Sequence, residues 1–255
     1  MNSALRQPLA GVALAIAVTT AMDASGLSAF SALPLFPLMC LFWYLQKLSR
    51  QSMGFTWGRW RHYGLAVLYP VAVLGAVGIV SAVAGVIDLS QSNWEKAGLN
   101  FALVAVTTIL VTIVTEEGFF RGWLFASFER AGATPGTTLA WSSIAFSLWH
   151  LSAVALNTGF DLPAKQIPVF MINAAVMGAV WGLLRLISGS VIVASVSHGL
   201  WNGGAYVFFG YGTRIGALGI DETAVYGPEV GILGLVLNLV FGAALWQWWN
   251  RIAQR

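Results

Sequence analysis

The stretch "NFALVAVTTILVTIVTEEGFFRGWLFAS", residues 100–127, decides the fold class of this chain. It is apolar over more than the roughly 20 residues that a helix needs to cross a bilayer. It nevertheless contains Glu116, Glu117 and Arg121 close together. Charged side chains inside hydrocarbon are costly and usually mark a functional site. The stretch therefore predicts a membrane helix whose charged residues have a chemical role.

The composition of the whole chain agrees with a membrane protein. Of its 255 residues, 58% are hydrophobic and only 9% are charged, whereas about 25% of the residues of a soluble domain are charged. The short-period alternation of a β-barrel is missing. We therefore predict an all-α, polytopic transmembrane helical bundle, a multi-pass integral membrane protein in which residues 1–255 form a single transmembrane domain. The lipid bilayer is its expected surroundings, and no nucleic-acid partner is expected. The eight predicted spans lie near residues 9–22, 27–46, 64–87, 100–127, 137–157, 167–187, 188–209 and 230–249.

The charges between these spans predict an orientation. Basic residues gather in alternate loops and at both termini, and the positive-inside rule places those segments in the cytoplasm. Most acidic residues, including Asp23 and Glu229, fall in the loops of the opposite side. Both termini are thus predicted to be cytoplasmic. The first span is short, so a cleaved signal peptide is an alternative for it. The basic residues of the predicted cytoplasmic side are Arg6, Lys47, Arg50, Arg59, Arg61, Arg130, Arg185, Arg251 and Arg255.

Three spans carry their titratable residues at a similar depth. With a rise of about 1.5 Å per residue, Glu116, His150 and His198 lie roughly 18, 20 and 15 Å from the cytoplasmic helix ends. Residues four apart share a helix face, so His198 and Asn202 are expected on one face and Phe146 and His150 on another. This predicts that these side chains meet near the middle of the membrane.

The charges of the fourth span also admit a purely structural interpretation. Glu117 and Arg121 are four residues apart and can pair as a brace between helices, and a buried histidine is often a packing residue. However, two acids and one base leave one negative charge unmatched. A shared proton, a histidinium or a metal ion would have to neutralise it. The glycines of "GAVWG" and "HGLWNG", by contrast, are predicted to allow close helix packing.

These residues resemble the motifs of a known family. "EEGFFR" at 116–121 is similar to the Glu-Glu-x-x-x-Arg motif of the CAAX-protease and bacteriocin-processing (CPBP, or Abi) family. "FSLWH" at 146–150 and "HGLWN" at 198–202 resemble its Phe-x-x-x-His and His-x-x-x-Asn motifs. The resemblance covers a catalytic core of roughly residues 100–205. It implies an intramembrane endopeptidase, similar to CAAX endopeptidases of the Ras-converting-enzyme type, which cleaves a membrane-associated peptide or protein.

The resemblance implies two mechanisms, and they differ in the cofactor. In a glutamate protease, Glu116 and His150 deprotonate a water, while His198 and Asn202 stabilise the oxyanion. Arg121 would then hold Glu117, and no cofactor is needed. In a metalloprotease, Glu116, His150 and His198 would bind Zn. Asn202 favours the glutamate mechanism, because an amide is a poor zinc ligand and a good oxyanion donor.

Two function classes other than a protease remain open at this point. A proton-coupled transporter would also bury carboxylates and histidines at mid-membrane, but it usually shows broken helices or repeat symmetry. A non-catalytic immunity or scaffold protein of the same fold could keep the motifs as structure. Loss of cleavage, loss of solute flux or an unchanged phenotype in mutants would distinguish the three classes.

Overall fold

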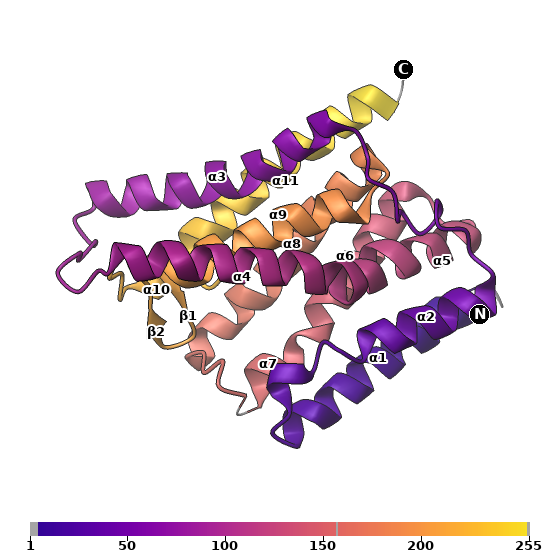
Figure 1. Cartoon of the computed structure of the whole chain (residues 1–255), viewed down its shortest axis with the longest axis horizontal. Coiled ribbons are helices and arrows are strands. Elements are labelled where there is room, and N and C mark those ends of the chain that lie inside the picture. The colour runs from indigo at the N-terminus through magenta and orange to yellow at the C-terminus, as the bar shows by residue number, and fades with distance from the viewer. Residues whose placement is uncertain (1–4, 157, 254–255) are drawn as a thin grey trace.

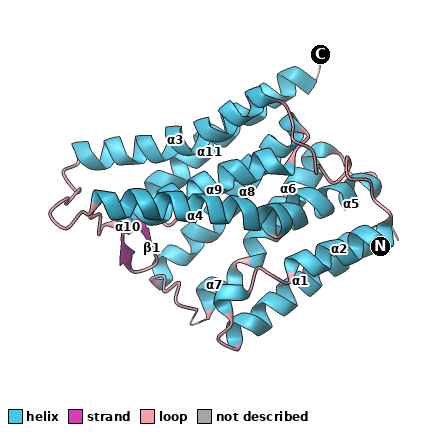
Figure 2. Ribbon diagram, viewed as in Figure 1, coloured by secondary structure: helices cyan, strands magenta, loops and turns pink. Residues whose placement is uncertain are grey.

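Long helices run side by side through the computed structural model, which describes residues 5–156 and 158–253 (Figure 1). Helices make up about three quarters of the described chain, and its strands form one short hairpin near α10 (Figure 2). The predicted all-α bundle is confirmed. The α-helices are α1 Arg6–Ala24, α2 Leu35–Gln46, α3 Trp60–Val83, α4 Trp94–Val114, α5 Phe125–Arg130, α6 Pro135–Trp149, α7 Leu151–Ala155, α8 Ile167–Ser188, α9 Val191–Gly204, α10 Thr223–Tyr226 and α11 Ile232–Ala253. The remaining elements are the 3₁₀-helices η2 Ser28–Phe30 and η4 Ala164–Gln166, the π-helices η3 Glu117–Leu124 and η5 Ala205–Phe209, and the antiparallel strands β1 Gly210–Tyr211 and β2 Arg214–Ile215.

Every predicted span coincides with helix, but not every span is one continuous α-helix. Six helical stretches of the described chain are long and apolar enough to cross a membrane. The predicted span 137–157 is divided between α6 and α7, and the span 188–209 is divided between α9 and η5. The number of eight crossings therefore stays a prediction. The six long stretches cover residues 6–24, 28–46, 60–83, 94–130, 164–188 and 232–253.

The outer surface of the bundle is apolar. Large side chains such as Val71, Leu110 and Val240 are more than half exposed, on α3, α4 and α11 respectively. Soluble monomers rarely expose large contiguous apolar patches, whereas a multi-pass membrane protein turns such side chains toward lipid. The interior holds the bulky rings of Trp123, Trp181 and Trp201.

The ends of the described chain lie at the same end of the bundle. Figure 1 places the N- and C-terminal labels on one side, opposite the hairpin and α10. This placement is what an even number of crossings requires. The compartment that this end faces stays a prediction from the loop charges.

Close glycine contacts join the helices that carry the motifs, as predicted. α4 packs along α9, and α6 packs along α8. A Cβ atom at Gly199 would lie 2.6 Å from the carbonyl oxygen of Ala105. At Gly182 it would lie 2.4 Å from Cδ1 of Leu139. At Gly199 any other residue type would press on the backbone of α4, whereas at Gly182 the side chain of Leu139 would have to shift.

The fourth span is not the regular helix that the sequence suggested. α4 ends at Val114, Thr115 has φ −103° and ψ −101°, and the chain then continues as the π-helix η3. A Cβ atom at Gly118 would lie 2.5 Å from the carbonyl oxygen of Ile113, so the wider turn depends on glycine there. π-Helical turns inside α-helices are frequent at functional sites.

Candidate active site

A buried ion-pair cluster lies where η3 meets α9. Nη1 of Arg121 lies 3.1 Å from Oε1 of Glu117, and both side chains are completely buried. The same Oε1 lies 3.0 Å from Nδ1 of His198. Nη2 of Arg121 donates to the carbonyl oxygen of Gly178 at 3.0 Å, which ties η3 to α8. The Glu117–Arg121 pair predicted from the sequence is thus present, and it also holds His198.

The contacts of His198 fix which of its nitrogens carries hydrogen. A carboxylate can only accept, so Nδ1 of His198 must donate to Glu117. Nε2 is then the nitrogen turned toward Glu116, whose Oε2 lies 3.9 Å away. The imidazole stacks on the indole of Trp181, with ring centroids 3.9 Å apart. His198 is therefore held rigidly between two glutamates.

His150 is positioned by the end of α6. The helix stops at Trp149, and Nδ1 of His150 lies 2.8 Å from the carbonyl oxygen of Phe146. Because that oxygen can only accept, Nδ1 carries the hydrogen and Nε2 is left with a free lone pair. The ring of Phe146 packs edge-on against His150 at 4.5 Å and also lies under the guanidinium of Arg121 at 4.2 Å.

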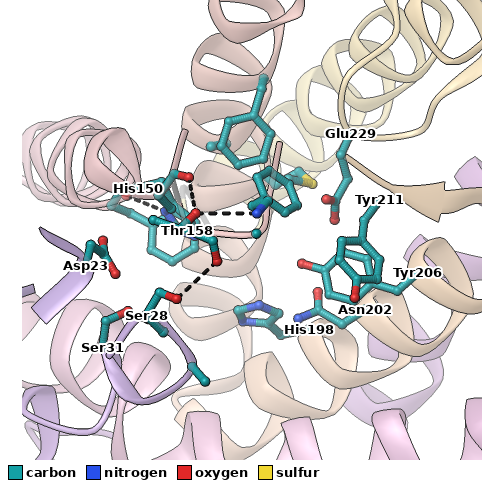
Figure 3. Close-up of a pocket in the computed structure, with 18 of the residues that line it drawn as sticks. Asp23, Ser28, Ser31, His150, Thr158, His198, Asn202, Tyr206, Tyr211 and Glu229 are labelled. Carbon is teal, nitrogen blue, oxygen red and sulfur yellow. Dashed lines mark hydrogen bonds between the residues drawn. The ribbon is translucent and has the colours of Figure 1, made fainter. Parts of the chain in front are cut away.

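One cavity of about 380 Å³ brings the motif residues together. Phe146, His150, His198 and Asn202 lie on its wall. Figure 3 shows His150 on one side of the cavity and His198 beside Asn202 on the other. The remaining lining residues come from α8 and from helix ends, short elements and loops toward the end of the bundle opposite the termini. They include Asp23, Ser28, Thr158, Tyr211, Arg214 and Glu229.

The structure differs from the expected arrangement at Glu116. The resemblance implies that Glu116 and His150 act on the same water, whereas among the described residues the ion-pair partner of Glu116 is His198. Glu116 is also absent from the residues that line the cavity, although its side chain is 15% exposed. The wider turn at the start of η3 changes the direction of the Glu116 side chain. The expected direction was worked out for a regular α-helix and therefore does not apply here.

The expected zinc ligands do not form a metal site in this arrangement. In the described part of the chain, no three histidine, cysteine, aspartate or glutamate side chains are placed to hold one ion. Glu116, His150 and His198 would have to move together before they could bind zinc with the usual short ligand distances of about 2 Å.

Two acidic residues of the cavity were counted from the sequence only as charges of the side opposite the basic loops, and the structure buries both. Asp23 is 3% exposed and Glu229 is 6% exposed, and both line the cavity. Glu229 precedes α11 and lies outside the long helices. Its burial raises the pKa of its carboxyl group to about 7. The sequence signal for this site was the pair of uncharged polar residues Asn173 and Asn238 inside predicted spans, since both support the Glu229 loop.

Comparison with known proteins identifies the region that holds the site. Residues 98–204 match the family model described as type II CAAX prenyl endopeptidase, Rce1-like. Neither the comparison with curated proteins nor the comparison with solved structures found a match. The matched region contains all three motifs, from the charged cluster of η3 to Asn202. The chain is therefore a multi-pass integral membrane protein, and its residues 98–204, which form much of the bundle interior, are similar to type II CAAX prenyl endopeptidases of the Rce1-like family.

Proposed function

We propose that the chain is an endopeptidase that cleaves a membrane-associated peptide or protein by attack of an activated water. The observation that supports this most directly is the position of His198. Its ring is fixed between Glu116 and Glu117, next to Asn202, on the wall of a cavity that also presents His150. The cavity wall thus offers His198 and Asn202 as two oxyanion donors, and Glu116 lies behind His198 as the carboxylate base, 3.9 Å from its Nε2; peptide hydrolysis requires both functions.

Charge balance favours a proton on His198. Glu116 and Glu117 carry two negative charges and Arg121 carries one positive charge, so one negative charge remains in a buried cluster. A protonated His198, which lies between both carboxylates, makes the cluster neutral. A buried cluster without net charge is far less costly than one with an unpaired charge. Protonated His198 also offers Nε2–H as a hydrogen-bond donor.

The proposed reaction begins when the substrate carbonyl enters beside His198. The 3.9 Å between Nε2 of His198 and Oε2 of Glu116 exceeds a hydrogen bond, so the carbonyl oxygen can take over this donor. Glu116 is then free to accept a proton from a water that Nε2 of His150 orients. The water oxygen attacks the carbonyl carbon, and the carbonyl electron pair moves onto its oxygen. His198 and the side-chain amide of Asn202 donate to this oxyanion.

The second half of the proposed reaction returns the enzyme to its initial state. The oxyanion electron pair re-forms the carbonyl, the carbon–nitrogen bond breaks, and the proton on Glu116 moves to the leaving amine. Glu117 and Arg121 do not contact the substrate in this scheme. They hold His198 in the orientation that directs Nε2 toward the reacting carbonyl.

Comparison of membrane peptides in cells provides the test. Cells that express the full chain, Glu116→Gln or the control Glu95→Gln are compared by mass spectrometry. Glu95 is an exposed acid at the start of α4, so its change should leave every peptide unaltered. We expect cleavage products with the wild type and with Glu95→Gln, and their absence with Glu116→Gln. Identical peptides from Glu116→Gln and wild type would contradict the proposal.

A further inference from the structure

Glu229 is held on the cavity wall by a buried hydrogen-bond network outside the three motifs. The hydroxyl of Tyr69 donates to Oδ1 of Asn238 at 2.7 Å, and Nδ2 of Asn238 donates to Oδ1 of Asn173 at 2.9 Å. Nδ2 of Asn173 donates to the backbone oxygen of Glu229 at 3.0 Å. The indole of Trp201 then donates to the carboxyl Oε1 of Glu229 at 2.8 Å. Helices α3, α8, α9 and α11 thus together fix one carboxyl group.

The backbone around Glu229 is packed too tightly to move freely. A Cβ atom at Gly227 would lie 2.5 Å from the oxygen of Thr223, and one at Gly234 would lie 2.2 Å from the oxygen of Pro228. Asn173, Asn238 and Tyr69 are all completely buried. The network therefore holds a rigid, preorganised carboxyl group, and Figure 3 shows that it points into the cavity.

This carboxyl group has no cationic partner within the described residues. The ion pairs of the described chain all belong to the Glu116–Glu117–Arg121–His198 cluster. Asp23 faces the cavity from the other side, and its buried Oδ1 has no hydrogen-bond partner although Oδ2 accepts from Ser152. The one arginine of the lining, Arg214, is exposed and bonds to the hydroxyl of Tyr211. The cavity wall thus carries two carboxyl groups that have no cationic partner within the described residues.

We propose that Glu229, with Asp23 across the cavity, binds the cationic side chain of a lysine or arginine of the substrate. A preorganised carboxyl group that lacks a protein counter-ion gains a charge-assisted hydrogen bond when such a side chain enters. The rings of Tyr206 and Tyr211, 5.3 Å apart on the same wall, add a surface that favours cations. This assignment rests on the proposed endopeptidase function and names its substrate class.

The cation site lies close to the proposed reacting centre. Trp201, which bonds to Glu229, follows His198 by three residues on α9, so both project from the same face within about one turn of 5.4 Å. An extended peptide advances about 3.3–3.6 Å per residue. The recognised basic residue should therefore lie within about three residues of the scissile bond.

The burial of Glu229 makes the recognition depend on pH. His198 on α9, Tyr206 on η5 and Tyr69 on α3 face Glu229, and of these three only His198 acts on its pKa, which it lowers, as does the hydrogen bond from Trp201. Burial raises the pKa of Glu229 to about 7, so the site is half protonated near neutrality. Preference for a cation should grow as the pH rises through this range and fade as the pH falls.

Binding can be measured without cleavage in full-length protein that carries Glu116→Gln. The probes are labelled Ala-Leu peptides that differ at one position, which holds lysine, norleucine or glutamate and is moved along the peptide. At one position we expect lysine to bind about tenfold or more tighter than norleucine, the size of a charged hydrogen bond. Adding Glu229→Gln should abolish this advantage, and Glu229→Lys should transfer it to glutamate. The control Glu222→Gln alters an exposed acid just before α10 and should preserve it.

Each outcome decides the proposal. Equal affinities at every position, absence of binding, or a lysine advantage that survives Glu229→Gln would overturn the cation site. Glu229→Gln is isosteric and keeps the oxygen that Trp201 needs, so its melting temperature should show an intact fold. Cleavage of the same peptides by the wild type separates the two proposals. Cleavage without lysine preference supports the endopeptidase and contradicts the cation site. Lysine-selective binding without cleavage supports the cation site and contradicts the endopeptidase.

Discussion

Replacement of Arg121 tests whether the charged cluster is held together by its pairing. In Arg121→Met, the apolar part of the side chain is roughly kept, and the guanidinium is lost. Glu117 then loses its 3.1 Å partner and the Gly178 carbonyl loses its 3.0 Å donor. Because the side chains of Arg121 and Glu117 are both completely buried, no solvent replaces the lost contacts. Breaking such a buried pair costs about 3–5 kcal/mol, so we expect the free energy of unfolding to fall by about that amount.

The double variant Glu117→Gln/Arg121→Met makes the prediction specific. Removal of both charges leaves no uncompensated carboxylate, and a buried pair replaced by neutral groups is often close to neutral in stability. We therefore expect the second change to restore most of the loss. Unfolding in mixed micelles, followed by tryptophan fluorescence, measures all the variants.

Arg185 provides the matched control. It is also buried, but its Nη2 donates to the backbone oxygen of Ser52 and it has no ion pair within the described chain. Glu117→Gln should therefore not rescue Arg185→Met. If Arg121→Met unfolds with the wild-type free energy, or if Glu117→Gln rescues both arginine variants equally, the pairing does not stabilise the fold in the way described.

Further predictions concern the oxyanion, the cofactor, pH and topology. Asn202→Ala should lower kcat by roughly a hundredfold with little change in KM, the usual effect of one oxyanion donor; an unchanged kcat would remove Asn202 from the reaction. Purified protein shown metal-free by elemental analysis after chelation should still cleave its peptide, and activity restored only by stoichiometric zinc would refute the glutamate mechanism. The folded-state pKa of Glu229, about 7 against an ordinary 4.5, makes wild-type stability fall as the pH rises between these values. Glu229→Gln should therefore be more stable than wild type above about pH 7, by up to about 3 kcal/mol, and equal to it near about pH 4.5; equal melting curves at alkaline pH would contradict this. Reporter fusions after Arg61 and Glu95 should report cytoplasmic and external positions respectively, and an external Arg61 fusion would reverse the predicted orientation.

The positions of the membrane helices could be predicted from the sequence because they depend on local properties. Apolar length alone located the six long apolar helical stretches, and four-residue spacing placed His198 and Asn202 on one face of α9. The same spacing paired Glu117 with Arg121 correctly. These predictions succeed wherever the helix is regular, since side-chain direction then follows from residue number.

The failures occur where tertiary contacts override local pattern. The wide turn after Thr115 keeps Glu116 off the cavity wall that His150 and His198 share, and no periodicity in the sequence reports such a turn. Glu229 was assigned to an outer loop because it lies between two predicted spans. Its burial depends on Asn173 and Asn238, which lie far away in sequence, so charge counting along the chain could not detect it.

The π-helical turn of η3 also determines how this segment responds to a change in length. A wider turn accommodates about one more residue than an α-helix does over the same axial rise. Deletion of one residue between Gly118 and Arg121 would remove that surplus and let the segment close into a regular α-helix. Glu117 and Arg121 would then be three residues apart instead of four, so the two side chains could no longer meet each other, Gly178 and His198 in the present geometry, even though their identities are unchanged. Residue spacing within "EEGFFR" is therefore as much a part of the site as the residues themselves, and a one-residue gap there should inactivate the protein more surely than most substitutions.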